Sequence, residues 1–274
     1  MKELKQKAID LFLKNTHYVI TDINKTRRIH NGYTNYSYYF QTSDFNEYQV
    51  RISKQTKNVD RKVELEFLKT INNKDYKYFD EKTGNAIKVW IKGKTVPFKQ
   101  ASKLVFINKL VEKIENLHAI APNDNIPVHD YFEYVKKSDL PEKYMNLYQK
   151  LTNIHCHGPY VMSHNDINPL NIILGSKKSI NLIDYEWGRL NTPWWDLINY
   201  IRELNLSHYK IRMIAYDNEL NPEDVKEQIY ICTCYAYMWT FYMPEDEMIL
   251  KYREQLKLQI EDYYTWITTN PKRK

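Results

Sequence analysis

The chain has 274 residues, of which 43% are hydrophobic and 27% charged, so a disordered chain, a collagen-like repeat and a coiled-coil rod are excluded. There are 40 Lys and Arg residues against 34 Asp and Glu residues, which gives a formal charge of +6. Because the positive residues are spread along the chain, we expect no nucleic-acid partner, and a small anionic ligand is at least as natural.

Cysteine usage and the N-terminal residues bear on the compartment. Cys232 and Cys234 are two residues apart, too close for an ordinary disulfide, and Cys156 belongs to no CxxC pair. The first 14 residues carry charges throughout, unlike a signal peptide. The uncharged run 229–243 is shorter than the ~20 residues that span a bilayer. We therefore predict a soluble, cytoplasmic protein without membrane insertion.

In chain order, the first third of the sequence predicts mainly strands, and the rest mainly helices. β-Branched and aromatic residues predict strands over 17–23, 36–41, 47–53 and 86–91, with one helix over about 58–72 among them. Helical spacing of apolar residues predicts helices over 103–118, 140–156, 193–205, 222–242 and 245–267, and short strands and loops fill 160–188. We expect an α+β fold with two lobes, residues 1–92 and 93–274, and a cleft between them.

The most informative segment runs from Ser163 to Asn171 and is followed by Asp184. Two short apolar runs flank a turn at Gly175, which predicts a hairpin that folds Asp184 back beside Asn171. Asn171 and Asp184 would then offer the oxygen ligands that suit Mg²⁺. Asp166 is left as a base or an orienting acceptor for a hydroxyl nucleophile. The alternative is that the aspartates only cap turns.

HNDINPLN (164–171) and LIDYEW (182–187) resemble the catalytic segment of the choline kinase and aminoglycoside phosphotransferase superfamily, most of all its LicA-type bacterial choline kinases. The resemblance implies a protein-kinase-like fold with a strand-rich N-lobe and a helical C-lobe. It also implies Asp166 as the catalytic base, Asn171 and Asp184 as ligands of Mg²⁺, and ATP as the phosphoryl donor.

Two further segments resemble the nucleotide-binding parts of this superfamily. Residues 31–35 are similar to its phosphate loop, which implies nucleotide contacts for Gly32, Thr34 and Asn35. An Asn-Gly hairpin turn explains the same residues equally well. Trp90 and Ile91 are similar to the hinge, where backbone groups would bind adenine.

Arg51 lies in a Val-Arg-Ile strand that resembles the strand carrying the phosphate-contacting cation of LicA-like enzymes. The resemblance implies that Glu64, on the following helix, pairs with Arg51. It also implies a catalytic role for both residues. Glu66 is a rival for this pairing, and a solvated arginine is the alternative for Arg51. We also expect Asp196 to tie the catalytic loop together.

The acceptor site is expected at aromatic side chains, because a quaternary ammonium binds aromatic faces. Trp239 and Tyr242 are three residues apart on a predicted helix, in a segment that resembles the wall of the choline site in choline kinases. Tyr185 and Glu186 are further candidates for facing the cation. Ordinary core packing of Trp239 and Tyr242 is the alternative.

We therefore expect a kinase that transfers the γ-phosphoryl group of ATP to the hydroxyl of choline. One alternative is a kinase of the same fold that acts on ethanolamine, an aminoglycoside or a sugar. Two others are a catalytically inactive nucleotide-binding protein and a nucleic-acid-binding module, the latter suggested only by net charge.

Overall fold

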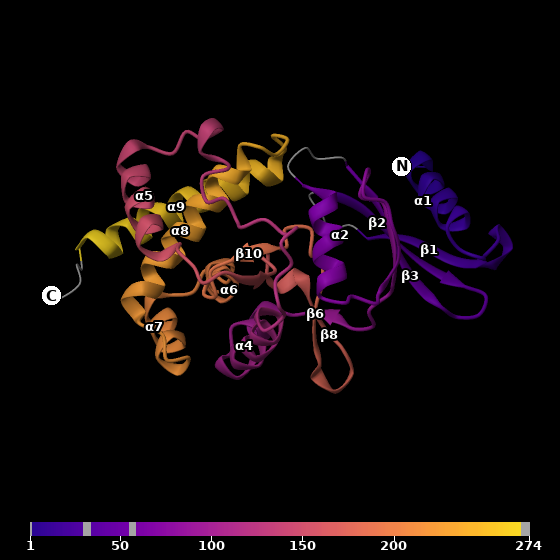
Figure 1. The fold of residues 1–274 in the computed structure, drawn as a ribbon, viewed down its shortest axis with the longest axis horizontal. Helices are drawn as coiled ribbons and strands as arrows, with labels where there is room; N and C mark the ends of the chain where they lie inside the picture. Colours follow the sequence, from indigo (N-terminus) through magenta and orange to yellow (C-terminus); the bar gives the residue numbers. More distant parts are fainter. Residues whose placement is uncertain (1, 30–33, 55–58, 270–274) are drawn as a thin grey trace.

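The structure is a computed structural model that describes residues 2–29, 34–54 and 59–269. Two lobes lie side by side along its long axis, an N-terminal lobe built on a sheet and a C-terminal lobe built of helices (Figure 1). The two-lobed α+β architecture predicted from the sequence is confirmed.

The N-terminal sheet is antiparallel and has the strand order β1-β2-β3-β5-β4. Its strands are β1 (Ile23–Ile29), β2 (Asn35–Thr42), β3 (Glu47–Ser53), β4 (Tyr76–Phe79) and β5 (Ala86–Val89). Phe40, Val50 and Ile87 form a buried apolar cluster with Ala8 and Phe12 of helix α1 (Lys2–Lys14). Helix α1 therefore covers the face of the sheet that is turned away from the C-terminal lobe (Figure 1).

The start of the chain differs from the prediction. The strand expected over 17–23 is wrong, because Ile20–Asp22 form a 3₁₀ turn and the first strand begins only at Ile23. The backbone N–H of Val19 donates to the Asp22 carboxylate at 2.8 Å, which closes this turn. Helix α1 was not predicted. Its sequence carries charges throughout, and only Ala8 and Phe12 are buried, so the apolar pattern that indicates a helix is weak.

Helix α2 (Arg61–Thr70) lies on the sheet face nearer the C-terminal lobe (Figure 1). It begins at Asp60, whose side chain accepts hydrogen bonds from the backbone N–H groups of Lys62 and Val63. Phe67 and Leu68 of this helix belong to the main apolar core, which is otherwise built from the C-terminal lobe. Helix α2 thus contacts both lobes.

The C-terminal lobe is organised around helix α8, which is buried along most of its length and is contacted by α5, α6, α7 and α9. The helices are α3 (Phe98–Ala101), α4 (Leu104–His118), α5 (Glu142–His155), α6 (Trp195–Glu203), α7 (His208–Asp217), α8 (Pro222–Thr240) and α9 (Glu247–Thr269). Five of these were predicted within about two residues, whereas α3 and α7 were not. Among the described residues, no helix has both the length and the apolar character needed to cross a membrane.

Short strands form the base of the cleft, one before α3 and four between α5 and α6. They are β6 (Lys94–Thr95), β7 (Val161–Ser163), β8 (Ile172–Leu174), β9 (Ile180–Leu182) and β10 (Arg189–Asn191). Strands β8 and β9 form the predicted hairpin, β6 pairs with β8, and β10 pairs with β7. Further 3₁₀ turns occur at Val135–Lys137, Pro169–Asn171 and Ser176–Lys178. The N–H of Ile183 donates to the carbonyl of Asn171 at 3.0 Å, which places Asp184 beside Asn171.

Candidate active site

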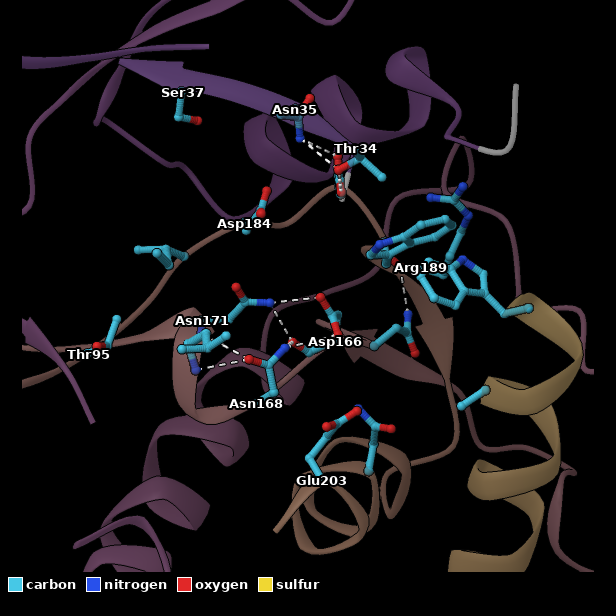
Figure 2. A pocket seen from close by; sticks show the side chains of 18 of the residues that line it. Thr34, Asn35, Ser37, Thr95, Asp166, Asn168, Asn171, Asp184, Arg189 and Glu203 are labelled. Atoms are coloured by element: carbon cyan, nitrogen blue, oxygen red, sulfur yellow. Dashed lines mark hydrogen bonds between the residues drawn. The ribbon is translucent and has the colours of Figure 1, made fainter. Parts of the chain in front are cut away.

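A cavity of about 540 Å³ lies between the lobes and is lined by residues from both. Thr34 and Asn35 reach it from the sheet, whereas Asp166, Asn171 and Asp184 reach it from the base of the cleft (Figure 2). The sequence placed all five in the site, and the structure brings them to one cavity.

Asp166 is held by the amides of two asparagines of its own loop. The Asn171 Nδ2 donates to Asp166 Oδ2 at 2.7 Å, and the Asn168 Nδ2 donates to Asp166 Oδ1 at 3.2 Å (Figure 2). Asn168 also accepts hydrogen bonds from the N–H groups of Leu170 and Asn171, so it caps the 3₁₀ turn that follows. The amide nitrogen of Asn171 therefore points at Asp166, and its Oδ1 remains available as an oxygen ligand.

The surroundings of Asp166 disfavour its charged form. Burial raises the pKa of the Asp166 carboxyl well above its usual value, and the nearby carboxylates of Glu203, Asp184 and Glu186 raise it further. A perturbed carboxyl in a cleft, next to a second carboxylate, is typical of a site that moves protons or binds cations.

A buried aspartate supports the catalytic loop from behind. The Asp196 carboxylate accepts the N–H of His164 at 3.0 Å and the N–H of Asn165 at 2.8 Å, and it lies 3.2 Å from the Nε2 of His118. The expected tie between Asp196 and the catalytic loop is thus present. His164 lies with its Nε2 2.9 Å from the carbonyl of Ile183, which connects this loop to the residue before Asp184.

The predicted ion pair between Arg51 and Glu64 is present and buried. Arg51 donates to Glu64 Oε1 at 2.7 Å and from its Nε to the carbonyl of Gly84 at 2.9 Å. The remaining guanidinium nitrogen has no hydrogen-bond partner among the described residues. Glu66, the rival, pairs with Lys69 on the surface instead. An unpartnered nitrogen on a fixed cation beside a cavity suits an anionic ligand.

Glu186 lines the cavity and is also bonded to three other protein groups. It accepts hydrogen bonds from the Thr34 hydroxyl and, at 2.9 Å, from the Asn35 amide, and Arg61 pairs with it at 2.9 Å. Its role as a substrate-facing carboxylate stays a prediction, and the structure adds a buried pairing with Arg61 that was not predicted. The bonds also show that Thr34 and Asn35 are fixed from the C-terminal lobe, while Gly32 lies outside the described residues.

The hinge candidates Trp90 and Ile91 line the cavity. The N–H of Trp90 already donates to the Glu47 carbonyl at 2.9 Å. Lys88, two residues earlier, also lines the cavity and was not predicted. Burial lowers the pKa of its amine, and the charge of Asp184 is the largest influence that opposes this shift. The sequence could have indicated Lys88, because side chains alternate between the two faces of a strand and Lys88 lies on the same face of the sheet as Arg51.

The aromatic wall differs in part from the prediction. Trp239 lines the cavity as expected, whereas Tyr242 does not line it and packs on Tyr134 with ring centroids 5.0 Å apart. Helix α8 ends at Thr240, so the shared helical face assumed for Trp239 and Tyr242 is absent.

Tyr185 is also corrected. Its ring packs between Phe67 and His164 in the core and does not line the cavity. The aromatic side chains that do line the cavity near Trp239 were missed, and they are Tyr134, Trp187, Trp195 and Tyr235. Helical spacing could have found Tyr235, which precedes Trp239 by four residues.

Two lobes, a cleft and a fixed Asp–Asn–Asp arrangement define a phosphotransferase of the kinase type. Residues 26–266 match the Choline/ethanolamine kinase family, and the chain belongs to this family. It is therefore a small-molecule kinase that phosphorylates an alcohol group.

The chain is also similar to individual proteins, in sequence to one and in fold to others. The chain is 29% identical over 259 residues to a Mycoplasma pneumoniae protein described as "Uncharacterized protein MG356 homolog", covering 92% of this chain and 91% of the relative. The choline kinase LicA from Streptococcus pneumoniae has a similar fold, with a TM-score of 0.72, 18% identity, and 96% and 99% of the two chains covered. A Plasmodium vivax ethanolamine kinase gives a TM-score of 0.73, 15% identity, and 92% and 85% coverage.

Proposed function

We propose that this kinase transfers the γ-phosphoryl group of ATP to the hydroxyl of choline. The observation that carries the proposal is that one cavity is lined by three groups of residues: the Asp166–Asn171–Asp184 cluster, the cationic Arg51 and Lys88 of the N-terminal lobe, and a set of aromatic side chains that includes Trp239. The first two parts suit phosphoryl transfer, and the third suits a quaternary ammonium.

The nucleotide is proposed to lie under the sheet. Arg51, oriented by Glu64, would contact the phosphates with its unpartnered nitrogen, and Thr34 and Asn35 would border them. Trp90 and Ile91 would bind the base through backbone groups other than the Trp90 N–H, which is already bonded. The LicA enzyme has a described complex with AMP, and an aminoglycoside phosphotransferase has one with GDP, which supports a nucleotide as a ligand of this fold.

Mg²⁺ fits the residues present. Asp184 supplies a carboxylate, and Asn171 supplies Oδ1, because its amide nitrogen is engaged by Asp166. Both are hard oxygen ligands, few in number, as Mg²⁺ prefers when it also binds phosphates and water. When bound, the ion would neutralise negative charge on the transferred group.

Asp166 is proposed to accept the proton of the acceptor hydroxyl. The hydroxyl oxygen forms a bond to the γ-phosphorus, the bond from that phosphorus to the ADP oxygen breaks, and ADP leaves. Asn168 and Asn171 fix both oxygens of Asp166, so its direction is set before the acceptor binds. Catalysis would come mainly from positioning and charge neutralisation, since the transition state is loose and anionic.

The compartment is proposed to be the cytoplasm. All three cysteines are buried and none forms a disulfide, which suits a reducing environment. ATP is also available there as the phosphoryl donor.

The test is release of ADP by the purified protein with MgATP and one of three acceptors: choline, ethanolamine or kanamycin. The proposal predicts that choline gives the highest kcat/KM. Activity with another acceptor alone would retain the kinase and reject choline. Binding of nucleotide without transfer to any alcohol would instead support an inactive nucleotide-binding protein.

A further inference from the structure

Arg61 lies at the centre of a buried polar network that crosses between the lobes. One of its terminal nitrogens donates to Glu64 at 2.7 Å and to Glu186 at 2.9 Å. The other donates to Asn35 at 3.2 Å and to Ser53 at 3.0 Å. Arg61 is 7% exposed, Glu64 is 0% and Glu186 is 3%, so water screens these charges little.

Each acidic partner of Arg61 also contacts or adjoins a group assigned to phosphoryl transfer. Glu64 uses its other oxygen to hold Arg51, at 2.7 Å. Glu186 follows Asp184 by two residues and comes from the C-terminal lobe. Arg61 therefore connects the cation on β3 to the segment that carries the expected metal ligand, through one carboxylate on each side.

The same network holds the beginning of strand β2. Thr34 and Asn35 both donate to Glu186, and Asn35 accepts from Arg61. Asn35, which lies on the same side of the cavity as Asp184 (Figure 2), is thus bonded to a residue of each lobe. A change in the distance between the lobes would break the three bonds to Glu186 together, because Thr34, Asn35 and Arg61 all belong to the N-terminal lobe.

Charge balance explains why such a network can be buried. Arg51 and Arg61 carry two positive charges, and Glu64 and Glu186 carry two negative charges, all joined by direct bonds. Removing one member leaves an uncompensated buried charge, which is strongly destabilising, whereas removing an opposite pair leaves none. This difference separates a role in folding from a role in activity.

We propose that Arg61 and Glu186 are positioning residues that set the closure of the two lobes, so that Arg51 and Asp184 reach the phosphates of one nucleotide. This inference rests on the proposed function. A purely structural pair would stabilise the fold equally well and would have no separate effect on nucleotide binding.

The experiment compares four proteins: the wild type, Arg61→Met, Glu186→Gln and the double variant Arg61→Met/Glu186→Gln. Thermal unfolding reports stability, calorimetric titration with MgADP reports nucleotide affinity, and steady-state kinetics report kcat and KM. Lys62→Met is the matched control, because Lys62 is the exposed neighbour of Arg61 on the same helix.

Both single variants should have a lower Tm, and the double variant should recover most of the loss because no buried charge is left unpaired. MgADP affinity should stay about tenfold weaker in the double variant, within the usual range of coupling between bonded residues. Its kcat should fall as well, while the KM for the acceptor alcohol changes little. Arg61→Lys keeps the charge but loses the forked geometry, and it should weaken MgADP binding with a smaller loss of Tm.

A double variant that regains stability and also binds MgADP and turns over like the wild type would overturn the positioning role. A double variant less stable than either single variant would overturn the charge-balanced network itself. Failure of the wild-type protein to bind MgADP is a different result, because it would reject the proposed function. If Arg61→Met does not fold, wild-type MgADP affinity in the folded Arg61→Lys variant would equally reject the proposal.

Discussion

Replacement of Asp196 by asparagine tests how the catalytic loop is held. The Asp196 side chain is fully buried, and its two oxygens accept the backbone N–H groups of Asn165 and His164 at 2.8 and 3.0 Å. An asparagine has only one oxygen, so one of these N–H groups would face an NH₂ group and lose its bond.

The expected cost follows from these contacts. A buried donor left without an acceptor costs about 1–3 kcal/mol. The bond that remains also loses the assistance of the carboxylate charge, roughly 1 kcal/mol more, since charge-assisted bonds are about twice as strong as neutral ones. We therefore expect the free energy of unfolding to fall by about 2–4 kcal/mol. Asn165 has a positive φ of 64° and immediately precedes Asp166, so its release should also displace Asp166 and lower kcat by about 100-fold.

Urea unfolding followed by tryptophan fluorescence, together with the kcat of phosphoryl transfer, measures both effects. Asp217→Asn is the matched control, because Asp217 also accepts an amide hydrogen bond, from Asn108 at 2.7 Å, but on the exposed surface. This control should change the free energy of unfolding by less than about 0.5 kcal/mol. If Asp196→Asn changed stability as little as the control and kept wild-type kcat, the account of the loop would be refuted.

Three more predictions concern single side chains. Burial, followed by the charge of Arg189, lowers the pKa of His129 to about 3, so below pH 6.5 the unfolded chain binds a proton that the folded chain does not. The free energy of unfolding should therefore be about 2 kcal/mol lower at pH 5 than at pH 7.5. Urea midpoints at both pH values should show a smaller loss of stability in His129→Gln, and an equal loss would exclude His129 as the cause. Trp239→Ala should raise the KM for choline about tenfold with little change in kcat, whereas Tyr242→Ala should leave KM unchanged, and the reverse order would move the acceptor site. Gly84→Ala should lower the free energy of unfolding by about 2 kcal/mol, because Gly84 has a φ of +76° and an added Cβ would lie 2.2 Å from Arg61 Nε. An unaltered urea midpoint would show that the turn adapts to the added methyl group.

Local patterns in the sequence predicted the base of the cleft well. The hairpin of β8 and β9 follows from two short apolar runs and a turn, and its pairing places Asp184 beside Asn171. Helices α4 and α8 follow from apolar residues at helical spacing or in long runs. The ion pair of Arg51 and Glu64 was predicted from a resemblance, and the spacing alone would not have selected Glu64 over Glu66.

Contacts across long stretches of chain could not be predicted in the same way. Arg61 and Glu186 are 125 residues apart, and no local pattern indicates that they meet. The pairing of Glu186 was therefore not predicted, because nothing in its own segment reveals that the buried cation of Arg61 lies opposite. The prediction that Tyr185 faces the acceptor was wrong for a related reason. Its ring packs on Phe67 of the other lobe, and no local pattern in the sequence indicates this contact.

Aromatic residues posed a further difficulty, since the chain contains 24 Tyr and 6 Trp residues and each is weak evidence alone. Trp239 was correctly placed at the cavity, but Tyr242 was not, because helix α8 ends between them. The stop signal after this helix is Pro244, four residues beyond Thr240, and it does not fix the residue at which the helix ends.

The most direct measurement of the central claim follows ³²P from [γ-³²P]ATP into choline in a single turnover, with the wild-type protein and with Asp166→Asn. The account predicts labelled phosphocholine from the wild type and almost none from Asp166→Asn, while both bind MgADP with similar affinity because Asp166 contacts the acceptor rather than the nucleotide. Labelled product at the wild-type rate from Asp166→Asn would contradict the role of Asp166 as the base. The absence of labelled choline with the wild type would contradict choline as the acceptor.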